Sequence, residues 1–179
     1  MRNIELKARC PSLSAAKQIA ERVGASFQGI EHQCDTYYRC LSGRLKLRER
    51  WSDQFRSSEL ISYHRSDTAC PRASDYSVVV VSNTETLRTL LADALGITVE
   101  VPKCRTVYSH ENVRIHLDDV SGLESFIEFE AVLDGSCDES RAHAKLQWLM
   151  EVFGVGPQQV MMTSYSDLLL GHHSVGTSE

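Results

Sequence analysis

Apolar and polar residues alternate with a period of two along most of this chain. The alternation predicts strands at residues 2–9, 27–40, 44–51, 59–65, 76–81, 99–110, 112–118 and 124–133. Apolar residues at helical spacing, each run closed by a glycine, predict helices at 14–23, 84–95 and 138–153. A short helix is also expected at 165–170. Such a series is typical of an α+β protein in which strands dominate.

The connections between the expected strands are short, which favours antiparallel pairing. His110, Glu111 and Asn112 suit a tight turn, so the strands on either side of them are expected to form a hairpin. No internal repeat, low-complexity block or linker interrupts the pattern. The sequence therefore predicts one domain over residues 1–170, followed by a flexible tail at 171–179.

Several expected strands carry charges of like sign on one face. Four basic residues alternate along one strand: Arg44, Lys46, Arg48 and Arg50. Glu128 and Glu130 share a face in the same way. A sheet with one face in water explains such alternation, although soluble surfaces tend to intersperse the two signs. If the sheet closes into a barrel, the charged faces instead meet around a lumen with basic and acidic walls.

A polyphosphate with a divalent cation needs that combination of walls. Arginine offers forked donors to phosphate oxygens and lysine a compact charge. Mg²⁺ and Mn²⁺ take oxygen ligands and keep several waters, so a few carboxylates are enough. His116 lies on the same face as its charged neighbours, where it is either a proton carrier or a packing and hydrogen-bonding residue.

Composition excludes several other classes. The chain is 42% hydrophobic and 24% charged, as expected for a folded globular protein, and no run is long enough to cross a membrane. A net charge of −5 gives no support for nonspecific nucleic-acid binding. The six cysteines contain no C-x-x-C pair, which argues against a zinc ribbon. Residues 1–7 alternate in polarity and do not resemble a signal peptide, so a cytoplasmic location is expected.

The first strand carries a motif with a known resemblance. Asn3-Ile4-Glu5-Leu6-Lys7 resembles the E-x-E-x-K signature of the CYTH superfamily, the triphosphate tunnel metalloenzymes. That superfamily includes class IV adenylyl cyclases and the thiamine and inorganic triphosphatases. Later segments agree with the family in order, at residues 35–38, 43–49, 60–65, 114–118, 126–130 and 164–169.

The resemblance implies a closed eight-stranded antiparallel β-barrel, or tunnel, flanked by helices. It implies that Mg²⁺ or Mn²⁺ is held by Glu5, Asp118, Glu128 and Glu130, which with Lys7 form the catalytic set. It places the phosphate-binding residues at Lys7, Lys46, Arg48, Arg65, Lys103, Arg105 and Arg114. Tyr165 is expected to cover the mouth of the tunnel.

The resemblance leaves three functions open. The segments at 116–123 and 126–130 are most similar to cyclase-type members, which convert ATP into cyclic AMP and pyrophosphate and imply a homodimer. A triphosphatase would instead release orthophosphate from inorganic or thiamine triphosphate. Asn3 stands where the signature has its first glutamate, which also motivates a noncatalytic sensor of polyphosphate or nucleotide. Asparagine can still offer an oxygen ligand.

Overall fold

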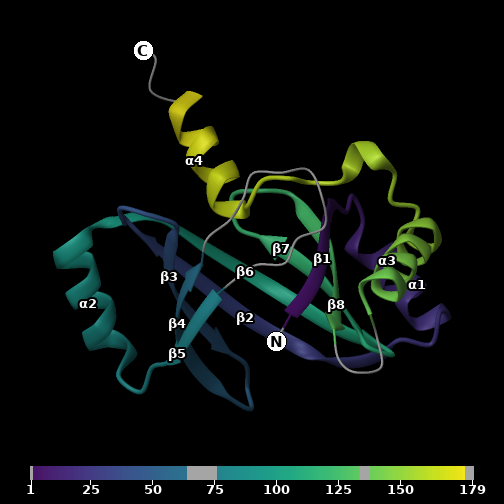
Figure 1. The fold of residues 1–179 in the computed structure, drawn as a ribbon, viewed down its shortest axis with the longest axis horizontal. Helices are drawn as coiled ribbons and strands as arrows, with labels where there is room; N and C mark the ends of the chain where they lie inside the picture. Colours follow the sequence, from purple (N-terminus) through teal and green to yellow (C-terminus); the bar gives the residue numbers. More distant parts are fainter. Residues whose placement is uncertain (1, 64–75, 134–137, 176–179) are drawn as a thin grey trace.

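The computed structural model describes residues 2–63, 76–133 and 138–175, in which strands and helices follow one another as in Figure 1. The strands are β1 (Arg2–Arg9), β2 (Ser26–Tyr38), β3 (Arg44–Trp51), β4 (Arg56–Tyr63), β5 (Tyr76–Val80), β6 (Ile97–His110), β7 (Val113–Val120) and β8 (Ser125–Leu133). The helices are α1 (Leu13–Arg22), α2 (Thr84–Leu95), α3 (Glu139–Phe153) and α4 (Tyr165–Val175). A short 3-10 helix at Pro157–Gln159 was not expected from the sequence. The expected strands and helices are all present, and α4 continues beyond its expected end.

The strands form one eight-stranded sheet in the order β1-β8-β7-β6-β2-β3-β4-β5, and every pairing is antiparallel. The hairpin of β6 and β7 turns at Glu111, which adopts a left-handed φ of 53°. The α+β class and the antiparallel sheet are therefore confirmed.

Closure of the sheet into a barrel is not confirmed. Within the described residues, β1 pairs with β8 alone and β5 with β4 alone, so the sheet has two edges. A closing ladder needs two edge strands of matched length and stagger. Here one edge has eight residues and the other has five, so β5 offers few backbone groups for such a pairing.

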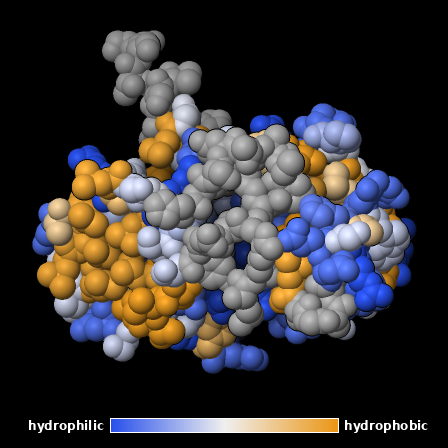
Figure 2. All heavy atoms as spheres, viewed as in Figure 1, coloured by the Kyte–Doolittle hydropathy of each residue, from blue (hydrophilic) through white to orange (hydrophobic). Residues whose placement is uncertain are grey.

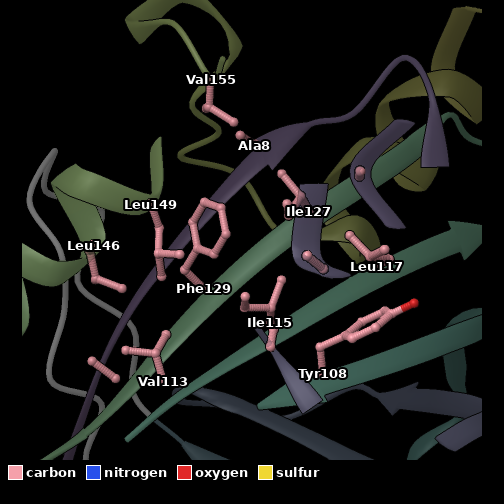
Figure 3. Packing of buried hydrophobic residues seen from close by; sticks show 14 of the residues in the cluster. Ala8, Tyr108, Val113, Ile115, Leu117, Ile127, Phe129, Leu146, Leu149 and Val155 are labelled. Carbon is pink, nitrogen blue, oxygen red and sulfur yellow. The ribbon is translucent and has the colours of Figure 1, made fainter. Parts of the chain in front are cut away.

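The main core lies between the sheet and the helices α1 and α3. Inward-facing residues of β7 and β8, among them Ile115 and Phe129, pack against Leu146 and Leu149 of α3 (Figure 3). Ser12 caps the start of α1 and Asp138 the start of α3, each accepting a hydrogen bond from a backbone N–H of the first turn. The opposite face of these strands is thereby left for polar side chains.

The other end of the sheet, around α2 and β5, has little packed core. Apolar atoms gather there on the surface, at the left of Figure 2. Val79, Val80 and Leu90 are 62%, 78% and 59% exposed, and no residue of α2 is buried. Strand pairing and the ion pairs of Arg88 therefore hold this end together. No helix in the described part of the chain is long and apolar enough to span a membrane.

Truncation of the core tests this division. Phe129 is fully buried and its ring lies 5.3 Å from that of Phe153, so Phe129→Ala should lower the free energy of unfolding by about 3–5 kcal/mol. Leu90→Ala, at the exposed end, should change it by less than about 1 kcal/mol. Urea denaturation followed by circular dichroism measures both, and equal losses would contradict the arrangement.

Candidate functional site

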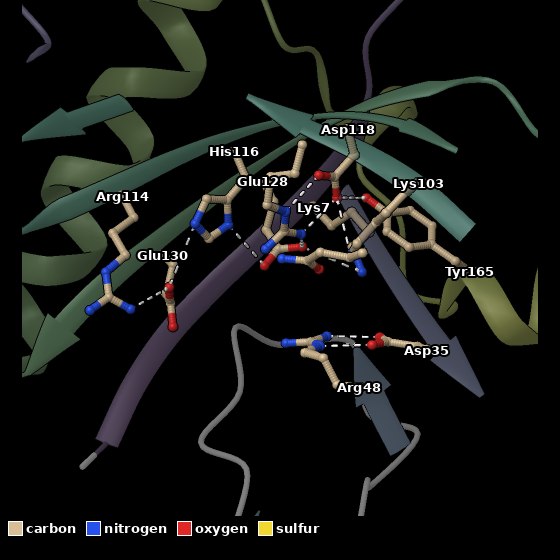
Figure 4. Close-up of polar contacts among 12 residues, drawn as sticks. Lys7, Asp35, Arg48, Lys103, Arg114, His116, Asp118, Glu128, Glu130 and Tyr165 are labelled. Atoms are coloured by element: carbon tan, nitrogen blue, oxygen red, sulfur yellow. Dashed lines mark hydrogen bonds and ion pairs between the residues drawn. The ribbon is translucent and has the colours of Figure 1, made fainter. Parts of the chain in front are cut away.

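The face of the sheet opposite α1 and α3 carries the charged residues that the alternation predicted. The strand register places basic or neutral side chains directly opposite acidic ones on neighbouring strands. Lys7 of β1 lies opposite Glu128 of β8, which lies opposite His116 of β7. Arg105 of β6 lies opposite Asp118 of β7. We call this side of the sheet the charged face; Figure 4 shows its side chains converging.

Asp118 is fully buried at the centre of the charged face. Arg105 grips it with two hydrogen bonds, from Nε to Oδ1 at 2.6 Å and from Nη2 to Oδ2 at 2.7 Å. The hydroxyl of Tyr165 donates to Oδ2 at 2.9 Å, and Lys103 Nζ lies 3.7 Å from the same oxygen. Burial alone would raise the pKa of the Asp118 carboxyl, but Arg105 and Lys103 outweigh it and lower that pKa. Asp118 is therefore ionised at neutral pH.

Glu128 shares Arg105 with Asp118 and has Lys7 and His116 as further partners. Its Oε2 lies 3.5 Å from Arg105 Nη2 and 3.7 Å from Lys7 Nζ, and its Oε1 lies 3.5 Å from His116 Nδ1. Burial opposes ionisation of Glu128, yet Arg105 and Lys7 hold its pKa well below the usual range. Burial and the charge of Arg105 lower the pKa of His116 below 6.5. His116 is therefore neutral at pH 7 and adds no positive charge beside the carboxylates.

Glu130 lies farther along β8, near the edge of the sheet. Asn3 Nδ2 donates to its Oε1 at 2.6 Å, and Arg114 Nη1 donates to its Oε2 at 3.3 Å. Glu5 lies directly across the β1–β8 ladder from Glu130 and is exposed. The charged face thus opens to solvent at its β1 edge and is buried around Asp118.

A second ion-paired group lies on β2 and β3. The buried Asp35 accepts hydrogen bonds from Lys46 Nζ at 2.8 Å and from Arg48 Nε and Nη2 at 2.7 and 2.8 Å. Burial would raise the pKa of Asp35, but Arg48 and Lys46, with a smaller contribution from Lys103, hold it well below its usual range. Sequence reasoning assigned no role to Asp35. The sequence did contain a signal for it. Asp35 is an acidic residue in the expected strand 27–40, and the next strand along the chain carries four basic residues on one face.

Helix α4 covers one end of the charged face. The ring of Tyr165 lies 4.8 Å from that of Phe126, and Lys7 Nζ lies 4.1 Å from the centroid of Tyr165. Arg44 fastens the start of the helix through Asp167 at 2.9 Å and Ser164 at 2.6 Å. Tyr165 therefore lies against two of the basic residues, with Lys103 Nζ 5.2 Å from the centroid of its ring.

The donors of the charged face fit a hard divalent cation, although they are not gathered around one point. Among the described residues, no group of three or more His, Cys, Asp and Glu side chains is arranged to hold a metal ion. Glu5 and Glu130, however, lie directly opposite each other, so two carboxylates face the same part of the β1–β8 ladder. Asn3 Oδ1 beside them is buried and accepts no hydrogen bond within the described part of the chain. Carboxylate and amide oxygens are ligands that Mg²⁺ and Mn²⁺ accept.

The structure thus brings most of the expected site residues to one face. These are Glu5, Lys7, Lys46, Arg48, Lys103, Arg105, Arg114, Asp118, Glu128, Glu130 and Tyr165. Arg114 is more exposed than the others that bear a basic group. Arg65 lies outside the described residues. Asp118 contacts Arg105, Lys103 and Tyr165.

An antiparallel sheet with α1 and α3 on one face and paired basic and acidic side chains on the other defines an α+β protein with a charged face. A family model for the CYTH domain matches residues 1–156, and the chain therefore belongs to the CYTH domain family. Proteins of this family are typically enzymes that act on triphosphates and depend on divalent cations. A comparison with curated proteins found no match.

Solved structures share the fold at low sequence identity. The PH1012 protein from Pyrococcus horikoshii OT3 is 22% identical, with a TM-score of 0.79 over 94% of this chain and 99% of that one. A candidate adenylate cyclase from Vibrio parahaemolyticus is 19% identical, with a TM-score of 0.77 over 94% of this chain and 98% of that one. A candidate adenylyl cyclase from Hippeastrum, described as having a dominant triphosphatase activity, is 14% identical, with a TM-score of 0.63 over 97% and 96% of the two chains. At these identities the likeness shows the fold alone.

The buried Lys103 predicts a pH dependence of stability. Burial, followed by the charge of Arg105, lowers the pKa of Lys103 from 10.5 to about 7. Between these two pH values the unfolded chain holds a proton that the folded protein lacks, so the folded state gains stability as pH rises through this window. Relative to Lys103→Met, the wild type should gain up to about 1.4 kcal/mol of unfolding free energy per pH unit from pH 7 to 10.

Urea denaturation of the metal-free protein at several pH values measures this difference. Lys145→Met is the control, because Lys145 forms its ion pair with Glu111 at the surface and that substitution should leave the pH profile parallel to the wild type. If the unfolding free energy of Lys103→Met also runs parallel to that of the wild type between pH 7 and 10, Lys103 has an ordinary pKa and the prediction is wrong.

Proposed function

We propose that this protein is a metal-dependent enzyme that acts on a triphosphate, and that its reaction is of the class IV adenylyl cyclase type, from ATP to cyclic AMP and pyrophosphate. One observation carries the proposal. Basic side chains of β1, β3, β6 and β7 share one face with buried carboxylates of β7 and β8. A chain of phosphates with a divalent cation has charges that complement both sets.

The basic residues would bind the phosphate oxygens. Arg105 and Arg48 each present a forked guanidinium that already holds a carboxylate in two-pronged geometry, the geometry that phosphate also accepts. Lys7 and Lys46 add compact charges around them, and Lys103, with a pKa of about 7, is partly protonated at neutral pH and adds a weaker one. Strand β2 lies between β6 and β3, and β8 and β7 lie between β1 and β6, but all of these side chains project from the same face of the sheet. A polyphosphate lying across the strands could therefore contact several of them together.

The acidic residues would hold Mg²⁺ or Mn²⁺. Glu128, Glu130 and Glu5 supply carboxylate oxygens, and Asn3 Oδ1 supplies a neutral oxygen beside Glu130. The bound cation would neutralise negative charge that develops as a phosphorus–oxygen bond breaks. Asp118 would keep Arg105 and Lys103 in place, and Tyr165 would exclude water from that end of the charged face.

Two reactions are compatible with this site. In a cyclase the 3′-hydroxyl of ATP attacks the α-phosphorus, whereas in a triphosphatase water attacks the terminal phosphorus. The similarity of residues 116–123 and 126–130 to cyclase-type members supports the first reaction. The triphosphatase activity in the description of the Hippeastrum relative supports the second as the alternative. A noncatalytic polyphosphate or nucleotide sensor, motivated by Asn3, is the remaining alternative.

Product analysis separates these reactions. The purified protein is incubated with Mg²⁺ or Mn²⁺ and, separately, with ATP, inorganic triphosphate or thiamine triphosphate. Cyclic AMP formed with an equal amount of pyrophosphate is the expected result. Orthophosphate from the triphosphates would replace the cyclase with a triphosphatase, and binding without any product would leave a sensor.

Removal of a carboxylate tests the metal site. Glu130→Gln keeps the size of the side chain but removes the negative charge, so turnover should fall roughly 100-fold or more. Glu151→Gln, on the exposed side of α3, loses the same charge and should retain wild-type turnover. Mn²⁺ affinity, followed by electron paramagnetic resonance, should fall in Glu130→Gln alone. Equal activity of the two variants would exclude Glu130 from the site.

A further inference from the structure

Asp35 makes more charge-assisted hydrogen bonds than the site assigned so far explains. Both of its oxygens are used, Oδ1 by Arg48 Nε at 2.7 Å and Oδ2 by Arg48 Nη2 and Lys46 Nζ, both at 2.8 Å. The strand register makes this possible, because Arg48 lies directly opposite Asp35 across the β2–β3 ladder and Lys46 lies two residues away on the same face. Asp35 is 4% exposed, so water competes little for these contacts.

The contacts leave donors of both basic groups available. A lysine ammonium has three N–H donors and an arginine guanidinium five, so each side chain keeps donors that Asp35 does not use. Lys46 and Arg48 are also among the residues to which the family resemblance gives a role in phosphate binding. Asp35 therefore fixes the direction of two basic side chains without using all of their binding capacity.

Such fixing matters because lysine and arginine are long and flexible. When a free side chain binds an anion it loses rotamer freedom, and that loss weakens binding. A side chain that another residue already holds loses less on binding. Preorganised charges of this kind are the usual source of strong anion binding and of transition-state stabilisation.

We propose that Asp35 is a positioning residue that holds Lys46 and Arg48 in place for the oxygens of a polyphosphate chain. The inference rests on the proposed function, because it assumes that the charged face binds a triphosphate. Asp35 itself does not touch the phosphates in this scheme, since a carboxylate would repel them. It acts through its two basic partners.

Net charge and positioning predict opposite effects of Asp35→Asn on the affinity for a triphosphate. Asp35→Asn removes one negative charge beside Lys46 and Arg48 and so raises the net positive charge of the binding face. If only charge mattered, a triphosphate should bind the variant more tightly. If positioning matters, it should bind more weakly in spite of the added positive charge.

The experiment is a calorimetric titration with inorganic triphosphate, done once with a chelator and once with Mg²⁺. Asp35→Asn should raise Kd at least tenfold in the condition in which the wild type binds. Glu49→Gln is the matched control, because Glu49 is the neighbour of Arg48 on the other face of β3, pairs with Arg88 at 3.0 Å, and carries the same charge. Its Kd should stay within twofold of the wild type. Circular dichroism and thermal unfolding show whether each variant is folded.

Each outcome decides the matter. A folded Asp35→Asn with unchanged or lower Kd overturns the proposal. If Asp35→Asn does not fold, Asp35→Glu takes its place, since it keeps the charge and shifts the carboxylate by one methylene. Weaker binding by Asp35→Glu supports positioning, and a wild-type Kd overturns it. If neither variant folds, Asp35 serves folding and the proposal is wrong. A wild type that binds no triphosphate under either condition instead overturns the proposed function.

Discussion

The buried pair of Arg105 and Asp118 is the interaction on which the charged face depends. A fully buried carboxylate is stable only with a partner that supplies both charge and hydrogen bonds, and Arg105 supplies two bonds in forked geometry. The same guanidinium reaches Glu128, and Asp118 accepts the hydroxyl of Tyr165. This single pair therefore links β6, β7, β8 and α4. Replacing either residue would leave the other as a buried charge without its main partner.

Pairing of opposite charges also explains how the protein tolerates so many buried ions. Lys7 lies near Glu128, Lys46 and Arg48 bind Asp35, and Arg105 binds Asp118. Under the proposed function, a triphosphate would compete with Glu128 for Lys7 and Arg105. A carboxylate released in this way would be available to a cation that enters with the phosphates. Anion and cation would then support each other's binding.

Local patterns in the sequence predicted the elements well, and contacts between elements poorly. The strand at 44–51 and the helix at 84–95 have the predicted ends, because alternation, an N-cap at Asn83 and a closing glycine are local features. Membership of the CYTH family was likewise predictable from ordered motifs. Closure of the sheet depends on the two edge strands, whose lengths differ. The partners of Asp35 and Glu128 depend on strand register, which a single sequence does not display.

The contacts of Asn3 explain why asparagine is tolerated where the family signature has a glutamate. Glu5 of β1 already lies directly across from Glu130. A glutamate in place of Asn3 would add a further negative charge beside these two carboxylates. Asparagine replaces that repulsion with a hydrogen bond from Nδ2 to Glu130, which an ionised glutamate has no proton to make. Its buried Oδ1 still offers an oxygen beside the carboxylates. Asn3 is thus compatible with a cation site of lower charge, so its presence alone does not favour a noncatalytic sensor over an enzyme.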